Sequence, residues 1–403
     1  MQEMSGAVRT YAWGSRTALA ELCGRPVPAP HPEAELWMGA HPADPAHLMG
    51  PDGPVSLLDL LAKDPEHHLG ARSRAAFGDR LPFLLKVLAA DETISLQAHP
   101  SSVQAAQGYA AEQQRGVALE SPVRNYRDAS HKPELVCALT RFDALAGFRE
   151  VATSVRLLAV LDCAALAPYT GLLSGQPDAA GLRALFTTWI TLPRPALDEL
   201  LPAVLDACVA HVRAHGEFAV EARTVLELGE SYPGDAGVLA ALLLNRISLQ
   251  PGQALYLPAG NLHAYLNGVA VEVMANSDNV LRGGLTPKHV DVPELLRVLD
   301  FTDADVPVLS PTAAAGQCHY PTPTDEFALS RLDLPAAGDA TVSHDGPQIL
   351  LCTSGSAELS TGSVLVALTG GASAWVAAAD GPVQVRAGEH GAQLFLVHDG
   401  LDR

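Results

Sequence analysis

Residues 93–101, with the sequence TISLQAHPS, hold two side chains that can bind a metal ion. Successive side chains of a strand point to opposite faces, so Gln97 and His99 share a face. Gln97 offers a carbonyl oxygen and His99 an imidazole nitrogen, and their i, i+2 spacing lets both reach one cation. An edge strand with polar residues facing water shows the same alternation. The stretch alone therefore leaves both interpretations open.

Two further segments place a metal-competent group on a similar face. Pro133 favours extended backbone, and alternation then puts Lys132 and Glu134 on one face, although an exposed ion pair would look the same. His263 lies in a strand that follows a proline-glycine turn. Nitrogen and oxygen donors from three strands, without a thiolate, suit a divalent ion such as Zn²⁺ at the mouth of a β-barrel. A single carboxylate leaves such an ion charged enough to act as a Lewis acid.

Longer segments around these residues carry a family resemblance. LPFLLKVLAADETISLQAHPS, HKPELVCALTRFDALAGFR, YPGD, PGQALYLPAGNLHAYLNG and MANSDNVLRGGLTPKHVDV occur in one order along roughly residues 8–300. Together they resemble the type I phosphomannose isomerases, zinc enzymes of the cupin superfamily. The resemblance implies a chain that interconverts D-mannose 6-phosphate and D-fructose 6-phosphate and so supplies GDP-mannose precursors. It also implies that Arg282 lies in the active site and that one zinc ion is held by Gln97, His99, Glu134 and His263.

The implied reaction moves protons between neighbouring carbons and oxygens, so it needs an acid/base residue. We favour Lys132 or His131, because they directly precede a predicted ligand. Asp278 can instead pair with Arg282, four residues later. The acid/base candidates are His131, Lys132, Glu272 and Asp278.

A sugar phosphate also needs cations. Arg282 offers a planar fork of donors, and the two glycines that follow it allow close backbone approach. Lys86 interrupts an apolar run and either reaches the surface or is directed into a cavity. Tyr265 either lines the sugar pocket or packs in the core. The candidate substrate-binding residues are Lys86, Ser95, Tyr265 and Lys288.

Two other functions are compatible with the same residues. A cupin Fe(II) oxygenase would use His99, Glu134 and His263 as a facial triad, with Gln97 as a bystander. A non-catalytic cupin that binds a sugar phosphate would retain the pocket without the reaction. The identity of the bound metal, oxygen consumption and exchange of the substrate C2 hydrogen with solvent distinguish the three.

Composition limits the partners. A net charge of −19 argues against nucleic acid or an anionic membrane as a partner, but a phosphate needs only a few local cations. No apolar run approaches the roughly 20 residues that span a bilayer. The N-terminal residues lack the order of a signal peptide, and the six scattered cysteines contain no CxxC motif. We therefore expect a cytoplasmic monomer with reduced thiols.

The 403 residues predict a mainly β chain with a helical insert. Residues 151–230 are rich in Ala and Leu at helical spacing, which predicts a helical domain. Residues 1–150 with 231–302 form the expected catalytic cupin domain, and the short β runs within 303–403 predict a metal-free jelly roll. Residues 303–325 read as a surface linker, and helices are predicted at 55–62 and 102–115.

Overall fold

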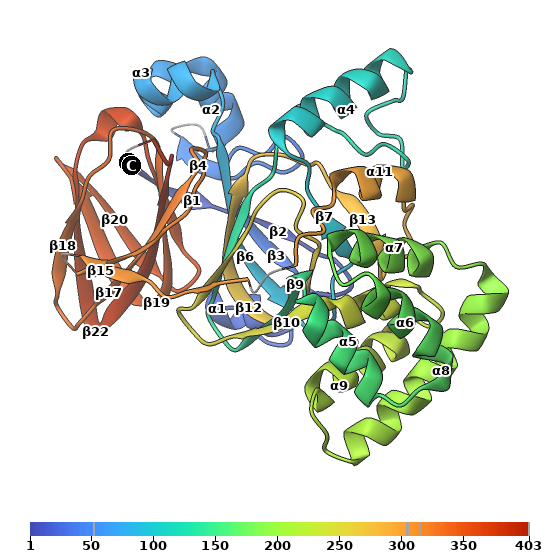
Figure 1. The fold of residues 1–403 in the computed structure, drawn as a ribbon. Coiled ribbons are helices and arrows are strands. Elements are labelled where there is room, and N and C mark those ends of the chain that lie inside the picture. The colour runs from blue at the N-terminus through green and yellow to red at the C-terminus, as the bar shows by residue number, and fades with distance from the viewer. Residues whose placement is uncertain (51–52, 304–305, 315, 402–403) are drawn as a thin grey trace.

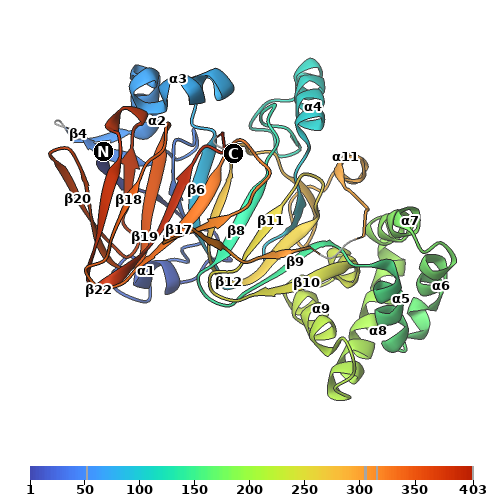
Figure 2. The same ribbon diagram turned by 60° about the vertical axis from the view of Figure 1, so that its left-hand side comes forward.

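The computed structural model describes residues 1–50, 53–303, 306–314 and 316–401. Within them the chain forms two antiparallel sheets of 11 strands each and a separate helical region. Figures 1 and 2 show the C-terminal sheet at one end, the second sheet in the middle and the green helices at the other end. The expected combination of β-structure with a helical insert is confirmed at this level.

The middle sheet, which we call the catalytic sheet, is organised around its longest strand, β12. This strand pairs with β9 in its first half and with β6 and β8 in its second half. The change of partner occurs at Gly268, where φ is +123° and a Cβ atom would lie 2.5 Å from the carbonyl oxygen of Arg141. The strands are β2 (Ala7–Arg9), β3 (Glu35–Met38), β6 (Phe83–Ala90), β7 (Leu96–Ala98), β8 (Glu134–Ala138), β9 (Phe142–Phe148), β10 (Leu244–Leu249), β11 (Ala254–Leu257), β12 (His263–Ala275), β13 (Leu281–Gly284) and β14 (Val308–Leu309).

Strand β12 is strongly curved. Near its end, Met274 pairs with Glu134 of β8, while His263 begins the strand. A straight strand would separate His263 from Met274, 11 residues later, by about 36 Å. The side chains of Glu134 and His263 nevertheless lie 3.3 Å apart. The curvature of β12 therefore brings residues that are distant along the sheet to one point.

The C-terminal sheet contains strands from both ends of the chain. Strand β1 pairs with β21, with Gln2 opposite Trp375, and β4 and β5 follow β1 at the edge. This differs from the expectation that residues 1–150 belong wholly to the catalytic domain; short strands carry no signal of which distant strand they will pair with. The strands are β1 (Gln2–Ser5), β4 (His47–Gly50), β5 (Gly53–Ser56), β15 (Thr312–Ala314), β16 (Gln317–Tyr320), β17 (Ala328–Leu334), β18 (Asp339–Val342), β19 (Gln348–Thr361), β20 (Val364–Thr369), β21 (Ser373–Val376) and β22 (Val383–His398).

The segment 303–325 is not the plain linker that its prolines suggested. Strand β14 extends the catalytic sheet beside β11, and β16 pairs with β17 of the C-terminal sheet. Proline is excluded from the centre of a sheet, because it cannot donate a backbone hydrogen bond, but it is tolerated at edges and between short strands. This segment therefore links the two sheets through backbone pairing.

The helices follow the predicted patterns closely. Residues 151–230 form five α-helices whose apolar faces pack around Phe186 and Trp189, and the same cluster reaches Phe148 of the catalytic sheet. Helix α4 begins with a capping box of Ser101 and Gln104. The helices are α1 (Ala18–Leu22), α2 (Leu57–Lys63), α3 (Pro65–Phe77), α4 (Ser102–Gln114), α5 (Val151–Val160), α6 (Ala167–Gly175), α7 (Ala179–Ile190), α8 (Arg194–Arg213), α9 (Ala219–Ser231), α10 (Gly237–Ala240) and α11 (Val292–Val298), with 3₁₀ turns η1 (Ala164–Leu166), η2 (Ala241–Leu243) and η3 (Ala378–Asp380).

The three largest apolar clusters of the described β-structure differ in where they lie. One lies within the catalytic sheet around Phe142 and Leu255, and one lies within the C-terminal sheet around Leu359 and Leu394. The third, which includes Trp375, joins the facing sides of the two sheets. The pairings between described strands run as open paths, so closed barrels are not seen in them. Among the described residues, no helix is both long and apolar enough to cross a membrane.

Candidate active site

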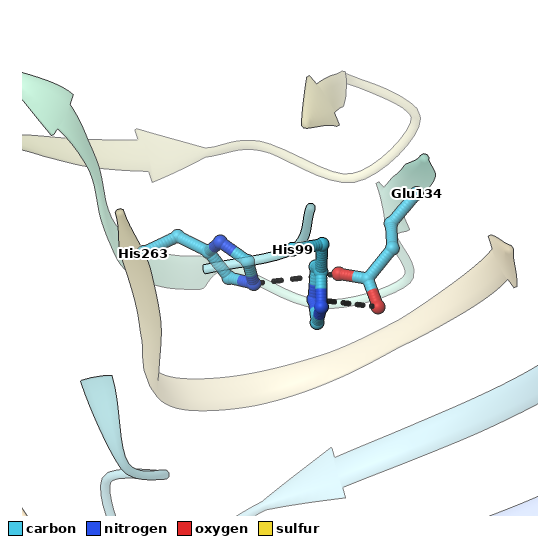
Figure 3. A group of neighbouring side chains, drawn as sticks. All are labelled: His99, Glu134 and His263. Carbon is cyan, nitrogen blue, oxygen red and sulfur yellow. Dashed lines mark ion pairs between the residues drawn. The ribbon is translucent and has the colours of Figure 1, made fainter. Parts of the chain in front are cut away.

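Three buried side chains converge where the catalytic sheet curves (Figure 3). His99 follows β7, Glu134 opens β8 and His263 opens β12, and each is at most 2% exposed. His99 Nε2 lies 3.3 Å from Glu134 Oε1, and His263 Nε2 lies 3.3 Å from Glu134 Oε2. Two imidazoles and one carboxylate of this kind form a donor set typical of divalent metal ions.

Backbone carbonyls determine which nitrogen each imidazole presents. Nδ1 of His99 lies 2.7 Å from the carbonyl oxygen of Asn279, and Nδ1 of His263 lies 3.1 Å from that of Asn261. A carbonyl oxygen only accepts hydrogen bonds, so Nδ1 carries the hydrogen in both rings. The lone pairs of both Nε2 atoms then face the Glu134 carboxylate. This is the orientation expected of metal-binding histidines.

Without a cation this arrangement is unfavourable. Both Nε2 atoms and Glu134 Oε2 are buried and have no hydrogen-bond partner among the described residues. Burial lowers the pKa of His99 to about 4, which keeps the ring neutral near pH 7. An unsatisfied buried polar atom costs about 1–3 kcal/mol, and here three of them face one another. The donor set therefore fits a bound metal ion.

The charge of Glu134 is maintained by a neighbouring cation. Burial opposes ionisation of this carboxyl, but the Lys132 ammonium holds its pKa well below the usual range. Lys132 Nζ lies 3.0 Å from Glu134 Oε1 and is itself buried. The predicted common face of Lys132 and Glu134 is thus an internal face, and the alternative of an exposed ion pair does not apply.

Gln97 occupies the neighbouring position in the sheet. Strand β7 lies between β12 and β13, and Gln97 stands opposite both His263 and Arg282. Its side chain lines the same cavity as Lys132 and Arg282. The structure therefore places Gln97 beside His263, one of the other three predicted ligands.

This cavity, of about 760 Å³, is rich in cations. Burial and the nearby charge of Arg127 both lower the pKa of Arg282. Burial and the charges of Arg282 and Arg127 lower the pKa of Lys288. The three cations line the same cavity, and an anion would relieve the repulsion between them. Sequence reasoning missed Arg127, because it lies in an irregular loop without periodicity. The basic lining residues are Lys86, Arg124, Arg127, Lys132, Arg282 and Lys288.

Lys86 does not reach the surface. It is 6% exposed, and its Nζ lies 3.2 Å from Glu272 and 3.5 Å from Glu35. Tyr265 donates a 2.7 Å hydrogen bond to the other oxygen of Glu272. Burial raises the pKa of Glu272, which Lys86 opposes. Lys86 lines the cavity, whereas Glu272 and Tyr265 are not among its lining residues.

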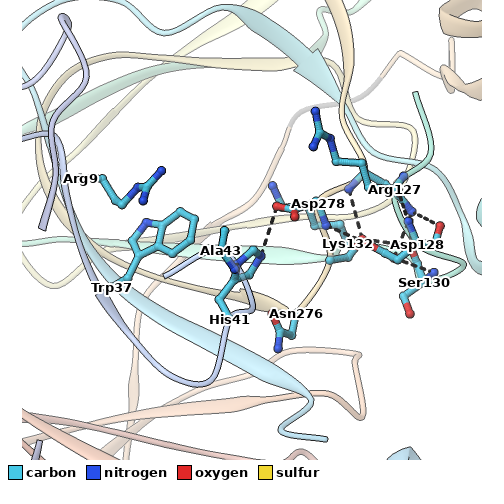
Figure 4. A network of polar contacts seen from close by, with 12 residues as sticks. Arg9, Trp37, His41, Ala43, Arg127, Asp128, Ser130, Lys132, Asn276 and Asp278 are labelled. Atoms are coloured by element: carbon cyan, nitrogen blue, oxygen red, sulfur yellow. Dashed lines mark hydrogen bonds and ion pairs between the residues drawn. The ribbon is translucent and has the colours of Figure 1, made fainter. Parts of the chain in front are cut away.

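The three remaining candidates differ in their surroundings. His131 contacts Glu326 of the C-terminal half, with Nε2 2.6 Å from Oε1, in a separate surface pocket. Asp278 lines the cavity, but its carboxylate contacts His41 at 3.2 Å instead of Arg282 (Figure 4). Ser95 is partly exposed before β7 and is not among the lining residues of the described cavities.

The C-terminal half holds a second group of metal-competent side chains, which the sequence reasoning did not expect. His344, His398 and Asp399 lie together, next to Arg72 of α3. The guanidinium of Arg72 lies 3.2 Å from Asp399 and 3.0 Å from His344 Nε2, so a positive group already occupies this cluster. We interpret it as a structural contact between α3 and the C-terminal segment.

Known proteins are similar to this chain in sequence and in fold. A model of the catalytic domain of type I phosphomannose isomerase matches residues 1–151. The mannose-6-phosphate isomerase of Escherichia coli is 41% identical over the whole length of both chains, and that of Homo sapiens is 32% identical, with 89% of this chain and 88% of the human chain covered. A zinc-bound mannose 6-phosphate isomerase superposes with a TM-score of 0.90 over 99% of both chains at 36% identity.

Proposed function

The chain belongs to the type I phosphomannose isomerase family, and we propose that it interconverts D-mannose 6-phosphate and D-fructose 6-phosphate with one bound zinc ion. The observation that carries this proposal is the pair of buried Nε2 lone pairs of His99 and His263, directed at the Glu134 carboxylate. Zinc is the ion named for a solved relative that covers 99% of this chain. Its proposed ligands are Gln97, His99, Glu134 and His263.

When bound, the ion supplies positive charge that polarises a sugar carbonyl and stabilises negative charge on oxygen. The protein supplies the remaining groups. Lys132 lies in the cavity wall, 3.0 Å from Glu134, and we assign it as the acid/base residue. The other candidate beside Glu134 in the sequence was His131. Lys132 lines the cavity that holds the cations, whereas His131 lies in another pocket.

We assign the phosphate to Arg127, Arg282 and Lys288. Their mutual repulsion in the half-buried wall is relieved by a dianion, and the guanidinium forks suit phosphate oxygens. Asp278 stands in the same cavity and is held ionised, because the pKa of its carboxyl is lowered by the hydrogen bond from His41 despite burial. It repels phosphate, and so we assign it to a sugar hydroxyl.

A coupled assay tests the function. Purified protein is expected to convert mannose 6-phosphate to fructose 6-phosphate, to lose this activity on dialysis against a chelator and to recover it with Zn²⁺. Elemental analysis should find one zinc per chain. Iron together with oxygen consumption would instead support the oxygenase, and tight substrate binding without exchange of the C2 hydrogen would support a binding protein.

We also propose that the two sheets are cupin jelly rolls. The curvature of β12 and the separate apolar cluster within each sheet support this interpretation. On this view residues 1–150 with 231–302 form the catalytic domain, apart from β1, β4 and β5, which join the jelly roll of 303–403, and 151–230 form the helical domain. We expect the protein to be cytoplasmic and monomeric. Gel filtration with light scattering would test the oligomeric state.

A further inference from the structure

His41 is a buried histidine that the assignments above do not use. It lies in the turn after β3, is 3% exposed and lines the active-site cavity. It also lines a second cavity of about 660 Å³, which extends toward α2. Figure 4 shows its ring between Trp37 and Asp278.

The contacts of His41 determine its tautomer. The backbone N–H of Ala43 donates to Nδ1 at 3.2 Å, so Nδ1 carries no hydrogen. Nε2 then carries the hydrogen and faces Asp278 Oδ1, 3.2 Å away. The ring of Trp37 packs edge-on at a centroid distance of 4.8 Å. His41 therefore presents its Nε2–H to Asp278 while Nδ1 accepts the hydrogen bond from Ala43.

Asp278 is held at the boundary between the two cavities. Its side chain is 46% exposed, and its backbone N–H donates to Asp128 Oδ2 at 2.9 Å. One carboxylate oxygen meets His41, and the residue lines both cavities. The remaining charged groups that face this carboxylate are Lys132, Arg127, Asp128 and Glu120.

We propose that His41 is a positioning residue for the isomerase reaction, which acts by holding the Asp278 carboxylate ionised and in one orientation toward the sugar. This inference rests on the proposed function and on the assignment of Asp278 to a sugar hydroxyl. A freely rotating carboxylate would lose part of its hydrogen bond to the substrate, and misplacement of a contact by about 1 Å is costly in an active site. His41 itself does not have to touch the substrate.

Two variants separate this role from a structural one. Gln places an amide N–H₂ near the position of Nε2, so His41→Gln keeps the donor to Asp278. Asn places its oxygen near Nδ1, so His41→Asn keeps the acceptor for Ala43 and loses the donor to Asp278. We expect His41→Asn to lower kcat/KM roughly 10- to 100-fold, the factor that corresponds to a hydrogen bond to a charged group, and His41→Gln to restore most of it.

The pH profile and a double variant provide independent readouts. Loss of the donor removes the contact that favours the ionised carboxyl, so the acidic limb of kcat/KM should move to higher pH in His41→Asn but not in His41→Gln. If His41 acts through Asp278, the double variant His41→Asn/Asp278→Asn should be no less active than Asp278→Asn alone. Zinc content should be unchanged throughout.

Several results would overturn the inference. Equal losses in His41→Asn and His41→Gln, or additive losses in the double variant, would show that His41 only supports the fold. Full activity of Asp278→Asn would remove the residue through which His41 acts, although the isomerase would stand. Absence of isomerase activity in the zinc-loaded wild-type protein would instead contradict the proposed function itself.

Discussion

His99 Nδ1 lies 2.7 Å from the carbonyl oxygen of Asn279, a residue 180 positions further along the chain. The side chain of Asn279 is fully buried and binds the backbone of Arg127, Asp128 and Ser130. One residue therefore orients an imidazole of the candidate metal centre and anchors the loop that carries a cation of the cavity. This links the proposed zinc and phosphate sites.

Replacing Asn279 should loosen both sites. Asn279→Ala keeps the backbone carbonyl that His99 contacts but loses the side-chain bonds that hold this residue in place. We therefore expect it to weaken zinc binding about tenfold, the lower end of the range for outer partners of metal-binding histidines. Competition with a fluorescent zinc chelator measures this. Asn276→Ala is the matched control, because the Asn276 side chain binds Leu81 on another segment. Equal zinc affinity in the two variants would contradict the role of Asn279.

Arg127 should contribute to substrate binding although it lies in a loop. We expect Arg127→Ala to raise KM for mannose 6-phosphate about tenfold, since one charge-assisted contact to phosphate is lost. The control is Arg115→Ala, whose guanidinium is 67% exposed on the protein surface. Steady-state kinetics of both variants decide the matter, and an unchanged KM in Arg127→Ala would place the phosphate elsewhere.

Replacing Arg282 by Lys keeps the charge and removes the planar fork. If Arg282 stabilises the transition state, Arg282→Lys should lower kcat strongly, whereas a clamp on ground-state phosphate would mainly raise KM. Zinc content and Tm should remain at the wild-type values in either case. Arg282→Ala with wild-type kcat/KM would exclude this residue from the site.

The contact between His131 and Glu326 predicts a pH-dependent stability. Although burial opposes ionisation, His131 and Thr324 lower the pKa of Glu326 from 4.5 to about 2. A lowered carboxyl pKa stabilises the fold above the unfolded value, and this contribution is lost as pH falls from about 4.5 toward 2. Glu326→Gln should therefore cost roughly 1–2 kcal/mol near pH 7 and less at pH 3.

Urea unfolding at both pH values measures this difference. Glu389→Gln removes an exposed carboxylate of the same half and serves as the control. A stability loss in Glu326→Gln that is the same at both pH values would show that ionisation of Glu326 is not responsible.

The C-terminal residues should be needed for solubility. Deleting residues 303–403 would remove β21, the partner of β1, and would expose the apolar cluster between the two sheets. We expect the truncated protein to be insoluble, as judged by its distribution after centrifugation. Leu365→Ser, a change at an exposed position of β20, should leave solubility unaffected. A soluble and active truncated protein would mean that the catalytic sheet folds without residues 303–403.

Local patterns in the sequence determined most elements, and together with the family resemblance they pointed to the candidate metal site. Strand alternation placed Gln97 and His99 on one face and Lys132 and Glu134 on another, because side-chain direction in a strand depends only on neighbouring residues. Helical spacing likewise located residues 151–230 as helices. These properties are local, so a single sequence carries them.

Only the tertiary structure decided which distant residues meet. Strand β1 pairs with β21, Lys86 finds Glu35 and Glu272, and Asp278 meets His41 instead of Arg282. Arg127 reaches the cavity from a loop that has no periodicity. Such contacts depend on the curvature of β12 and on burial across the sheets, and no local spacing encodes them. The sequence thus determined the chemical groups, whereas their partners and charges followed from the fold.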